Sequence, residues 1–258
     1  EHHRQSDNTR ARPHLSLPCL HATKQNAHSG HDRQSGGGEA GSGKGAQQSQ
    51  HNDGMIKNLI FDFGRVLVDY DFFHIIDTMF TDKEAEQEFC SIFVTNTFID
   101  RCDREDIPFI DIIRETQAQF PQFRTELQAF YDRYPDFVTG EVPHMAELLA
   151  ELKEKGYKLY GLSNWCSKVY DIIPRYSIFN LLDGYVVSSD VHLIKPDTAI
   201  YHCLCEKYGL KPEECLFADD KMPNIVGARN AGMEAVLFTD AHRYAQHLRE
   251  SLNISLSL

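Results

Sequence analysis

From residue 57 onward, short apolar runs alternate with longer helix-like segments, and this alternation constrains the fold more than any other feature of the chain. The first run, Lys57–Phe63, reads K-N-L-I-F-D-F, which is typical of a strand buried on both faces of a parallel sheet. It ends at Gly64, where a tight turn forms easily. Four further runs are predicted to be strands: Tyr157–Leu162, Gly184–Val187, Cys215–Ala218 and Ala235–Phe238.

Segments with helical periodicity lie between these runs. The clearest has Pro143 where a helix can begin and Gly156 where it can end. The predicted helices are Pro143–Lys155, Ser167–Arg175, Asp197–Tyr208, Pro223–Ala231 and Ala241–Leu252. Such alternation implies right-handed crossovers and helices on both faces of the sheet. The predicted fold class is therefore α/β, a Rossmann-like, doubly wound parallel sheet.

Residues 72–141 interrupt the alternation, because they show helical periodicity but no convincing strand. The predicted helices are Met79–Val94, Ile107–Phe120 and Phe123–Tyr134, separated by Asp100–Asp106 and by Pro121. The insertion enters at the carboxyl end of the first strand, where ligands bind in such sheets. We expect a helical cap over a polar site, with residues 55–71 and 142–258 forming the core domain. The alternative is an insertion that only adds stability.

Residues 1–54 contain no Phe, Trp or Tyr, but they hold 8 of the 16 glycines. A segment this poor in apolar side chains cannot offset the entropy lost when it becomes ordered. We expect a disordered tail, or an artefact at the start of the gene, because Met55 is a natural first residue.

Charge and hydropathy exclude some classes of partner. The formal net charge of −12 disfavours electrostatic binding to nucleic acid or to an anionic membrane. The mean hydropathy is −0.43, and no apolar run approaches the roughly 20 residues that span a bilayer. Seven cysteines without a C-x-x-C pair fit reduced thiols. We expect a cytoplasmic monomer or homodimer without a nucleic-acid or membrane partner.

Polar residues lie at the ends of three predicted strands: Asp62, Ser163, Asn164, Asp219 and Asp220. Lys195 follows the strand Gly184–Val187 after a short loop. Carboxylates at neighbouring strand ends repel each other unless a cation lies between them. Mg²⁺ with oxygen ligands meets this need and leaves room for a substrate phosphate. A lysine and a serine hydroxyl would complete a phosphoryl pocket, and one aspartate could attack phosphorus to form an aspartyl-phosphate.

Four motifs in this order resemble those of the haloacid dehalogenase (HAD) superfamily of hydrolases with an aspartate nucleophile. They are F-D-F-G-R-V-L at Phe61–Leu67, L-S-N at Leu162–Asn164, I-K-P at Ile194–Pro196 and F-A-D-D-K-M-P-N-I at Phe217–Ile225. The resemblance covers residues 56–240. Within the superfamily the chain looks most like phosphatases related to the bacterial alpha-D-glucose-1-phosphate phosphatase and the phosphatase domain of soluble epoxide hydrolase.

This resemblance implies a role for each site residue. Asp62 would be the nucleophile, and Lys195 would share in the catalysis. The Mg²⁺ ligands would be Asp62, the carbonyl oxygen of Gly64, and Asp220. The phosphate would contact Ser163, the backbone amide of Asn164, and Lys195. Asp219 would support the metal or orient Lys195, and Asn224 would contact the water shell of the metal.

Gly64 departs from the superfamily pattern, in which a second Asp two residues after the nucleophile protonates the leaving group. Glycine cannot move a proton, and general acid–base catalysis is typically worth about 10²–10⁴-fold. An anomeric phosphate, whose leaving hydroxyl is more acidic than an ordinary alcohol, fits Gly64 better than an alkyl phosphate. Other candidate proton carriers are Asp69, Asp71, His74, Asp103 and Asp106.

The segment Cys102–Ile107 resembles the part of the relatives' cap that dips toward the site, so Arg104 could contact substrate. The alternative is a solvated turn that begins a helix. We therefore predict a Mg²⁺-dependent phosphatase of a small phosphorylated metabolite, with a sugar phosphate and an anomeric phosphate favoured. The alternatives are a metal-free 2-haloacid dehalogenase, against which Asp219 and Asp220 argue, and a regulatory protein that binds a phosphorylated ligand without turnover.

Overall fold

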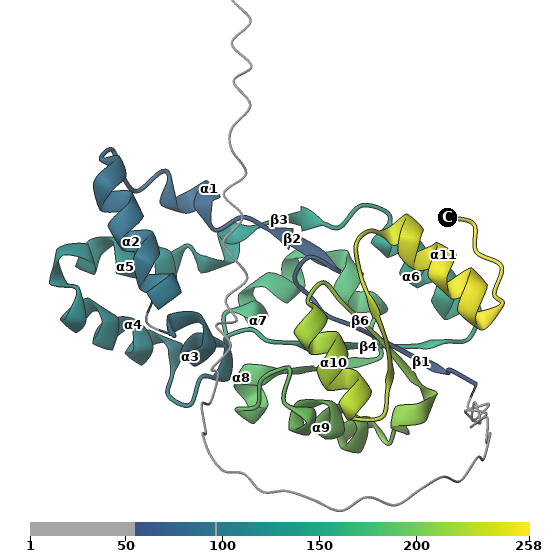
Figure 1. The fold of residues 1–258 in the computed structure, drawn as a ribbon. Coiled ribbons are helices and arrows are strands. Elements are labelled where there is room, and N and C mark those ends of the chain that lie inside the picture. The colour runs from purple at the N-terminus through teal and green to yellow at the C-terminus, as the bar shows by residue number, and fades with distance from the viewer. Residues whose placement is uncertain (1–54, 96) are drawn as a thin grey trace, which may run out of the picture. The chain divides into compact units, whose positions relative to one another are not determined.

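The computed structural model describes residues 55–95 and 97–258, so the predicted tail of residues 1–54 lies outside the described residues. Within them, five strands form one sheet (Figure 1). They are β1 (Asn58–Phe61), β4 (Lys158–Ser163), β5 (Gly184–Val187), β6 (Cys215–Asp219) and β7 (Glu234–Leu237). The order is β5-β4-β1-β6-β7, and all neighbours are parallel. The predicted α/β fold is confirmed.

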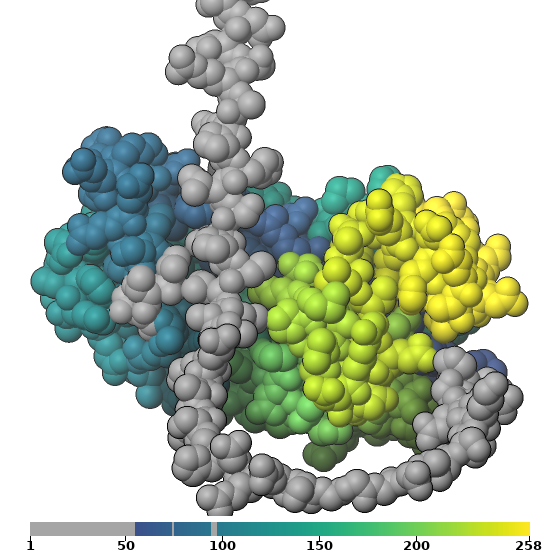
Figure 2. All heavy atoms as spheres, in the orientation of Figure 1, coloured from purple at the N-terminus to yellow at the C-terminus, as the bar shows by residue number. Residues whose placement is uncertain are grey.

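Helices cover both faces of this sheet. The four longest outside the insertion are α6 (Met145–Glu154), α9 (Thr198–Tyr208), α10 (Met222–Asn230) and α11 (Ala241–Leu252). Leu59 and Phe61 of β1 pack in the cluster that contains α6 and α11, whereas Ile60 packs with α9 and α10. This alternation explains the near-continuous apolar pattern of β1. The outer surfaces of α10 and α11 remain exposed (Figure 2).

Two short helices follow β4 and β5: α7 (Val169–Ile172) and α8 (Ser188–Val191). The sequence predicts one helix over Ser167–Arg175, but α7 is shorter and continues as a 3₁₀ turn over Ile173–Arg175. Pro174 lies in that turn and has no backbone N–H for a helical hydrogen bond.

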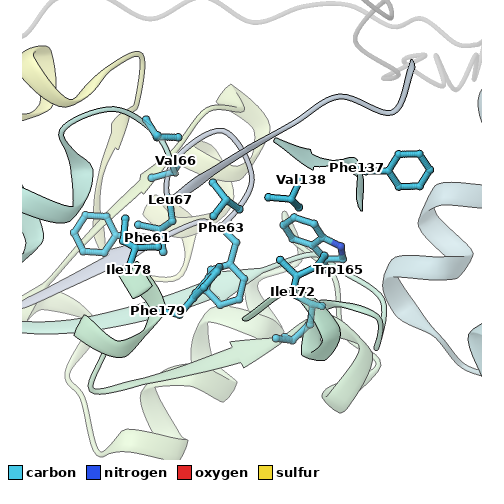
Figure 3. Close-up of a cluster of buried hydrophobic side chains, with 14 of the residues drawn as sticks. Phe61, Phe63, Val66, Leu67, Phe137, Val138, Trp165, Ile172, Ile178 and Phe179 are labelled. Atoms are coloured by element: carbon cyan, nitrogen blue, oxygen red, sulfur yellow. The ribbon is translucent and has the colours of Figure 1, made fainter. Parts of the chain in front are cut away.

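A cluster of aromatic side chains supports the backbone where β1 and β4 end (Figure 3). Phe61 and Phe63 lie on either side of Asp62, and the Phe63 ring meets Phe179 edge to face at 4.9 Å between centroids. Trp165, two residues after β4, belongs to the same cluster. Full burial of such a side chain stabilises the fold by about 1.5–3 kcal/mol. The strand ends are therefore fixed by their apolar neighbours.

β1 lies in the middle of the sheet, with β4 on one side and β6 on the other. The chain therefore reverses its direction of winding at β1, and such a switch point is where open α/β sheets bind ligands. The backbone N–H of Asp62 donates to the carbonyl of Ala218 at 3.0 Å, so the ends of β1 and β6 are in register. Residues that follow these strands meet at one edge.

A two-stranded antiparallel ribbon, β2 (Val68–Tyr70) with β3 (Val138–Glu141), frames the insertion. Between its strands lie the inserted helices: α1 (Phe73–Ile76), α2 (Lys83–Thr95), α3 (Phe98–Arg104), α4 (Phe109–Gln119) and α5 (Arg124–Asp132). Figure 1 shows them grouped beside the sheet. Among the described residues, no helix combines the length and the apolar character needed to cross a membrane.

The sequence pattern misses two elements of this segment. β3 lies inside residues 72–141, where no strand is predicted. The sequence pattern misses it because β3 has only four residues, which pair with β2, a strand that precedes the insertion. Asp100–Asp106 is predicted to separate helices, but most of it belongs to α3. This seven-residue helix buries only Phe98 and Cys102, four positions apart, which is too short a pattern to show periodicity.

Candidate active site

Three carboxylates, which we call the acidic triad, meet at the carboxyl ends of β1 and β6. Asp62 follows β1, Asp219 is the last residue of β6, and Asp220 comes next. Each offers an oxygen within 4.8 Å of the others. Asp62 and Asp219 are buried, and Asp220 is half-buried. Like charges this close require a cation between them.

Lys195 supplies part of this positive charge. Its Nζ lies 2.9 Å from Asp62 Oδ1 and 2.7 Å from Asp219 Oδ2, and it donates to the Leu162 carbonyl at 2.8 Å. The residue is only 3% exposed. Burial lowers the pKa of Lys195, but Asp219 and Asp62 more than offset this effect, so the pKa is raised and the ammonium stays charged.

Asn164 holds the loop that carries Lys195. Its Nδ2 donates to the Lys195 carbonyl at 3.0 Å, and its Oδ1 accepts from the Lys195 backbone N–H at 2.8 Å. This reciprocal pair ties the loop to the end of β4. The side chain of Asn164 therefore positions Lys195, a role that the sequence does not reveal, and phosphate binding by its backbone amide stays a prediction.

Both carboxylate oxygens of Asp219 are engaged within the protein. Oδ1 accepts from the backbone N–H of Lys221 at 2.8 Å and from Asn224 Nδ2 at 3.0 Å. Oδ2 accepts from Lys195 at 2.7 Å and again from Asn224 at 3.0 Å. Of the two roles open to Asp219, these contacts favour the orientation of Lys195. Asn224 in turn orients Asp219.

Asp62 and Asp220 keep carboxylate oxygens that could hold a metal ion. Asp62 uses Oδ1 for the backbone N–H of Phe63 at 2.7 Å and for Lys195, which leaves Oδ2. Within the described part of the chain, Asp220 Oδ1 is buried without a hydrogen-bond partner. Burial raises the pKa of Asp62 to about 6 and also raises that of Asp220. A hard divalent cation fits this donor set and would favour the charged carboxylates.

Ser163 adds a hydroxyl to the same edge of the sheet. It is the last residue of β4 and is 1% exposed. Its Oγ finds no hydrogen-bond partner among the residues that the structure describes. A buried polar group without a partner costs about 1–3 kcal/mol, which a bound anion would recover by accepting the hydrogen bond.

The ring of Tyr70 occupies the space beside Gly64. A Cβ at Gly64 would lie 2.7 Å from Tyr70 Cε1 and 3.8 Å from Trp165 Cζ3. Burial raises the pKa of the Tyr70 phenol, whose charged neighbours include Lys221 and Asp220. A second aspartate at position 64 would therefore force the Tyr70 ring to move.

Lys221 and Tyr70 are site residues that sequence reasoning missed. Burial lowers the pKa of Lys221, but Tyr70, Asp62, Asp220 and Asp103 more than offset this effect and raise it. The position of Lys221 directly after the acidic pair was an available signal. The sequence gives no comparable signal for Tyr70, because the approach of its ring to Gly64 depends on the turn that leads into β2.

The last turn of α3 contacts the ends of β4 and β5 through what we call the α3 latch. The Ser188 hydroxyl accepts from the Trp165 backbone N–H at 2.9 Å and donates to the Asp103 carbonyl. The Glu105 carboxylate accepts from the backbone N–H and hydroxyl of Ser167 at 2.6 and 2.7 Å. The predicted approach of residues 102–107 to the polar edge thus has a structural basis.

The other candidate proton carriers have different surroundings. Asp71 accepts from the backbone N–H of Phe73 at 2.9 Å, at the start of α1. The side chain of Asp69 is 41% exposed, and its Oδ1 lies 3.6 Å from Nη1 of Arg65. Asp106 is exposed, and the side chain of His74 lies outside the described residues.

Arg104 lines a cavity of about 210 Å³ beside the loop that carries Lys195. The other lining residues are His192, Leu193, Ile194, Pro196 and Asp197. The acidic triad does not line this cavity. Contact between Arg104 and substrate therefore stays a prediction.

Comparison with known proteins identifies the family. The family model of haloacid dehalogenase-like hydrolases matches residues 59–238, which is more than half of the chain. The HAD-family enzyme of Bacteroides thetaiotaomicron, solved with magnesium and inorganic phosphate, has a TM-score of 0.62 and 20% identity. That similarity covers 75% of this chain and 100% of the other, and at this identity it shows the fold alone. This chain belongs to the haloacid dehalogenase-like hydrolase family.

Two relatives are similar over part of their length. The phosphoglycolate phosphatase of Haemophilus influenzae is 28% identical over 137 residues, which are 53% of this chain and 61% of the relative. The glyceraldehyde 3-phosphate phosphatase of Methanothermobacter thermautotrophicus is 35% identical over 107 residues, or 39% of this chain and 47% of the relative. Each match spans less than two thirds of the relative.

Proposed function

We propose that this haloacid dehalogenase-like hydrolase is a Mg²⁺-dependent phosphatase of a small phosphorylated metabolite and that Asp62 is its nucleophile. The carrying observation is the position of the Lys195 ammonium, 2.9 Å from Asp62 and 2.7 Å from Asp219. The unpartnered oxygen of Asp220 and the hydroxyl of Ser163 lie at the same edge of the sheet. The two relatives described above, both named as phosphatases, support this proposal.

In the proposed reaction, one carboxylate oxygen of Asp62 attacks phosphorus and an aspartyl-phosphate forms as the bond to the leaving oxygen breaks. Lys195 donates to the phosphoryl oxygens on which negative charge accumulates, and Asp219 holds its ammonium in place. The Ser163 hydroxyl donates to another of these oxygens. Water then cleaves the aspartyl-phosphate and restores Asp62.

Mg²⁺ would be held by Asp62, Asp220 and the carbonyl oxygen of Gly64. When bound, it neutralises phosphate charge and lowers the repulsion between the dianion and Asp62. The availability of Asp220 Oδ1 supports this assignment. Asp219 would then act by holding the Lys195 ammonium rather than by binding the metal ion.

Within this class, a sugar phosphate with an anomeric leaving group is the substrate we propose. No carboxylate can stand at position 64 while Tyr70 keeps its place, so proton assistance from that position is excluded. An anomeric hydroxyl needs less assistance than an alkyl hydroxyl. The kind of sugar depends on side chains from the inserted helices.

The test is phosphate release from a panel of phosphorylated metabolites, with Mg²⁺ and with EDTA. We expect Mg²⁺-dependent release in the wild type, and a rate at background in Asp62→Asn. Glu234→Gln, an exposed change at the start of β7, is the control and should keep the wild-type rate. A beryllofluoride phosphoryl mimic with Mg²⁺ should raise the Tm of the wild type but not of Asp62→Asn.

Three outcomes would reject the proposal. Halide release from a 2-haloacid that survives EDTA would favour the dehalogenase alternative. Binding of phosphorylated ligands without any release that depends on Asp62 would favour the regulatory alternative. Phosphate release that is equal in the wild type and Asp62→Asn would remove Asp62 from the reaction.

A further inference from the structure

A phosphatase that uses Asp62 as its nucleophile still needs a proton donor for an ordinary alcohol leaving group. Gly64 cannot supply the proton, and the Tyr70 ring fills the space that an added side chain would take. The donor must therefore come from another element that reaches the same edge of the sheet. The α3 latch brings one such element to that edge.

Three consecutive residues in and after the last turn of α3 are held to the core. The Asp103 carbonyl accepts from the Ser188 hydroxyl, and the Arg104 carbonyl lies 3.0 Å from Nδ1 of His192. The Glu105 carboxylate accepts two hydrogen bonds from Ser167. Because these partners follow β4 and β5, the backbone of Asp103 is fixed at the carboxyl end of the sheet, where the acidic triad lies.

Asp103 is half-buried as a residue, and its carboxyl group interacts with the charges of the site. The charged groups that act on its pKa are Lys221, Asp62 and Lys195 of the core, and Asp100 of its own helix. The charge of Asp103 in turn contributes to raising the pKa of three nearby groups: Cys102, Cys166 and Tyr134. Burial raises the pKa of Asp103 to about 7, with Lys221 acting in the opposite direction. A carboxyl group with this pKa exchanges a proton readily at neutral pH.

We propose that Asp103 is the general acid of this site and that it donates a proton to the leaving-group oxygen. The inference rests on the phosphatase function proposed above, and it extends the proposed reaction from anomeric phosphates to alkyl phosphates, whose leaving oxygen needs a proton. A carboxyl group on the inserted helices would thus do the work of the carboxyl group that is missing at position 64. Asp106, three residues further along, is exposed and lies outside the α3 latch.

The proton balance closes over one turnover. The Asp62 carboxylate forms a bond to phosphorus, and the electron pair of the breaking P–O bond stays on the leaving oxygen. That oxygen takes the proton of Asp103, which becomes a carboxylate. A water molecule then attacks phosphorus and gives a proton to Asp103, while the Asp62 carboxylate departs and inorganic phosphate forms.

Tyr70 is the competing donor, because its phenol neighbours Lys221, Asp220 and Asp62. Burial raises its pKa above an already high ordinary value. The deprotonated phenol is therefore scarce at neutral pH, so Tyr70 is a poor base for the second step. Asp103 suits both steps, and the experiment below separates the two residues.

The test compares two leaving groups in the holoenzyme with Mg²⁺: p-nitrophenyl phosphate, whose phenolate needs no proton, and the best alkyl phosphate of the panel. We expect Asp103→Asn to lower kcat/KM for the alkyl phosphate by about 10²-fold or more. The loss for p-nitrophenyl phosphate should be at least tenfold smaller. Asp103→Glu should recover part of the alkyl activity, and Asp106→Asn is the matched control without a differential effect.

The pH profile gives a second readout. In the wild type, the ratio of alkyl to p-nitrophenyl kcat/KM should fall as the pH rises through about 7, because Asp103 loses the proton that it donates. In Asp103→Asn the ratio should be low and independent of pH. Taking the ratio removes effects that both substrates share, such as the ionisation of Asp62.

Equal losses for both substrates in Asp103→Asn, or no loss, would overturn this inference and leave the proposed phosphatase intact. A leaving-group effect that appears in Tyr70→Phe instead would move the role to Tyr70. Failure of the proposed function looks different, because phosphate release would then be independent of Asp62. Tm values that match the wild type would confirm that the variants fold. If Asp103→Asn does not fold, the measurements on Asp103→Glu still test the inference.

Discussion

The strand-end site and the inserted helices are held in place by different interactions. At the strand ends, buried charged groups bind one another through short hydrogen bonds, as Lys195 does with Asp219 at 2.7 Å. Among the inserted helices, aromatic rings make the contacts. Phe130 packs against Phe93 and Phe137 at centroid distances of 4.8 and 4.9 Å.

This difference has a functional consequence. A network of directional bonds fixes the atoms of a reaction to within a fraction of an ångström, but it fails when one member is lost. Aromatic packing tolerates changes of side chain, which suits a region whose surface can vary with the substrate. The α3 latch is where polar groups of the inserted helices meet the core, and there the two kinds of interaction meet.

The largest expected effect comes from Lys195→Met, which removes the cation between two buried carboxylates. In EDTA at pH 7, we expect the free energy of unfolding to fall by roughly 3–5 kcal/mol, because breaking a buried pair leaves charges uncompensated. Phosphate release with Mg²⁺ should fall to background. Denaturant unfolding measures the stability, and Lys158→Met, at a site 62% exposed, should change it by less than about 0.5 kcal/mol.

The loss in Lys195→Met should depend on pH. The pKa of Asp62 in the folded protein is about 6, above its ordinary value of 3.8, and loss of Lys195 raises it further. Between pH 7 and pH 5, the folded variant therefore binds more protons relative to its unfolded chain than the folded wild type does. Acidification then stabilises the variant more than the wild type, and the difference in their free energies of unfolding shrinks. A deficit that grows on acidification would contradict this account.

A smaller effect is expected from truncating one leucine in each region. Leu127 of α5 and Leu148 of α6 are both fully buried and belong to one continuous apolar cluster. Leu127→Ala and Leu148→Ala should each cost about 2–5 kcal/mol. Because the cluster is shared, each variant should unfold in a single transition, which circular dichroism and tyrosine fluorescence would report at the same temperature. Two separate transitions would show that the inserted helices are an independent unit.

The smallest effect is expected at the α3 latch. Glu105→Gln weakens its hydrogen bonds to Ser167, and we expect a loss of about 1 kcal/mol because the site is partly exposed. KM for the best substrate should rise several-fold. Glu115→Gln makes the same change at an exposed pair with Arg101, between α3 and α4. If both variants behave alike, the latch has no special part in holding the inserted helices to the core.

Much of this architecture could be predicted from local sequence. Each strand of the five-stranded sheet is long enough to show an apolar run, and the polar residues at the ends of β1, β4 and β6 are read directly from the chain. Asp62, Ser163, Asp219 and Asp220 could be placed at one edge because parallel strands end on the same side. Their detailed pairing could not, since the same residues allow Asp219 to serve either the metal or Lys195.

The insertion was harder to predict, because its short elements take their stability from partners distant in the chain. α3 has only two buried residues, and β3 pairs with a strand from before the insertion. The contact between Ser188 and Asp103 joins residues 85 positions apart. No local pattern encodes such a contact, so Asp103 remained one of five candidate proton carriers.

The sequence by itself determined the sheet, the family and the position of Asp62, the proposed nucleophile, because burial on both faces of a strand leaves a local apolar pattern. Only the tertiary structure showed that Tyr70 fills the space beside Gly64 and that α3 brings Asp103 to the polar edge. The physical reason is that proximity across an insertion depends on how whole helices pack. That packing is set by many weak contacts at once rather than by any single stretch of residues.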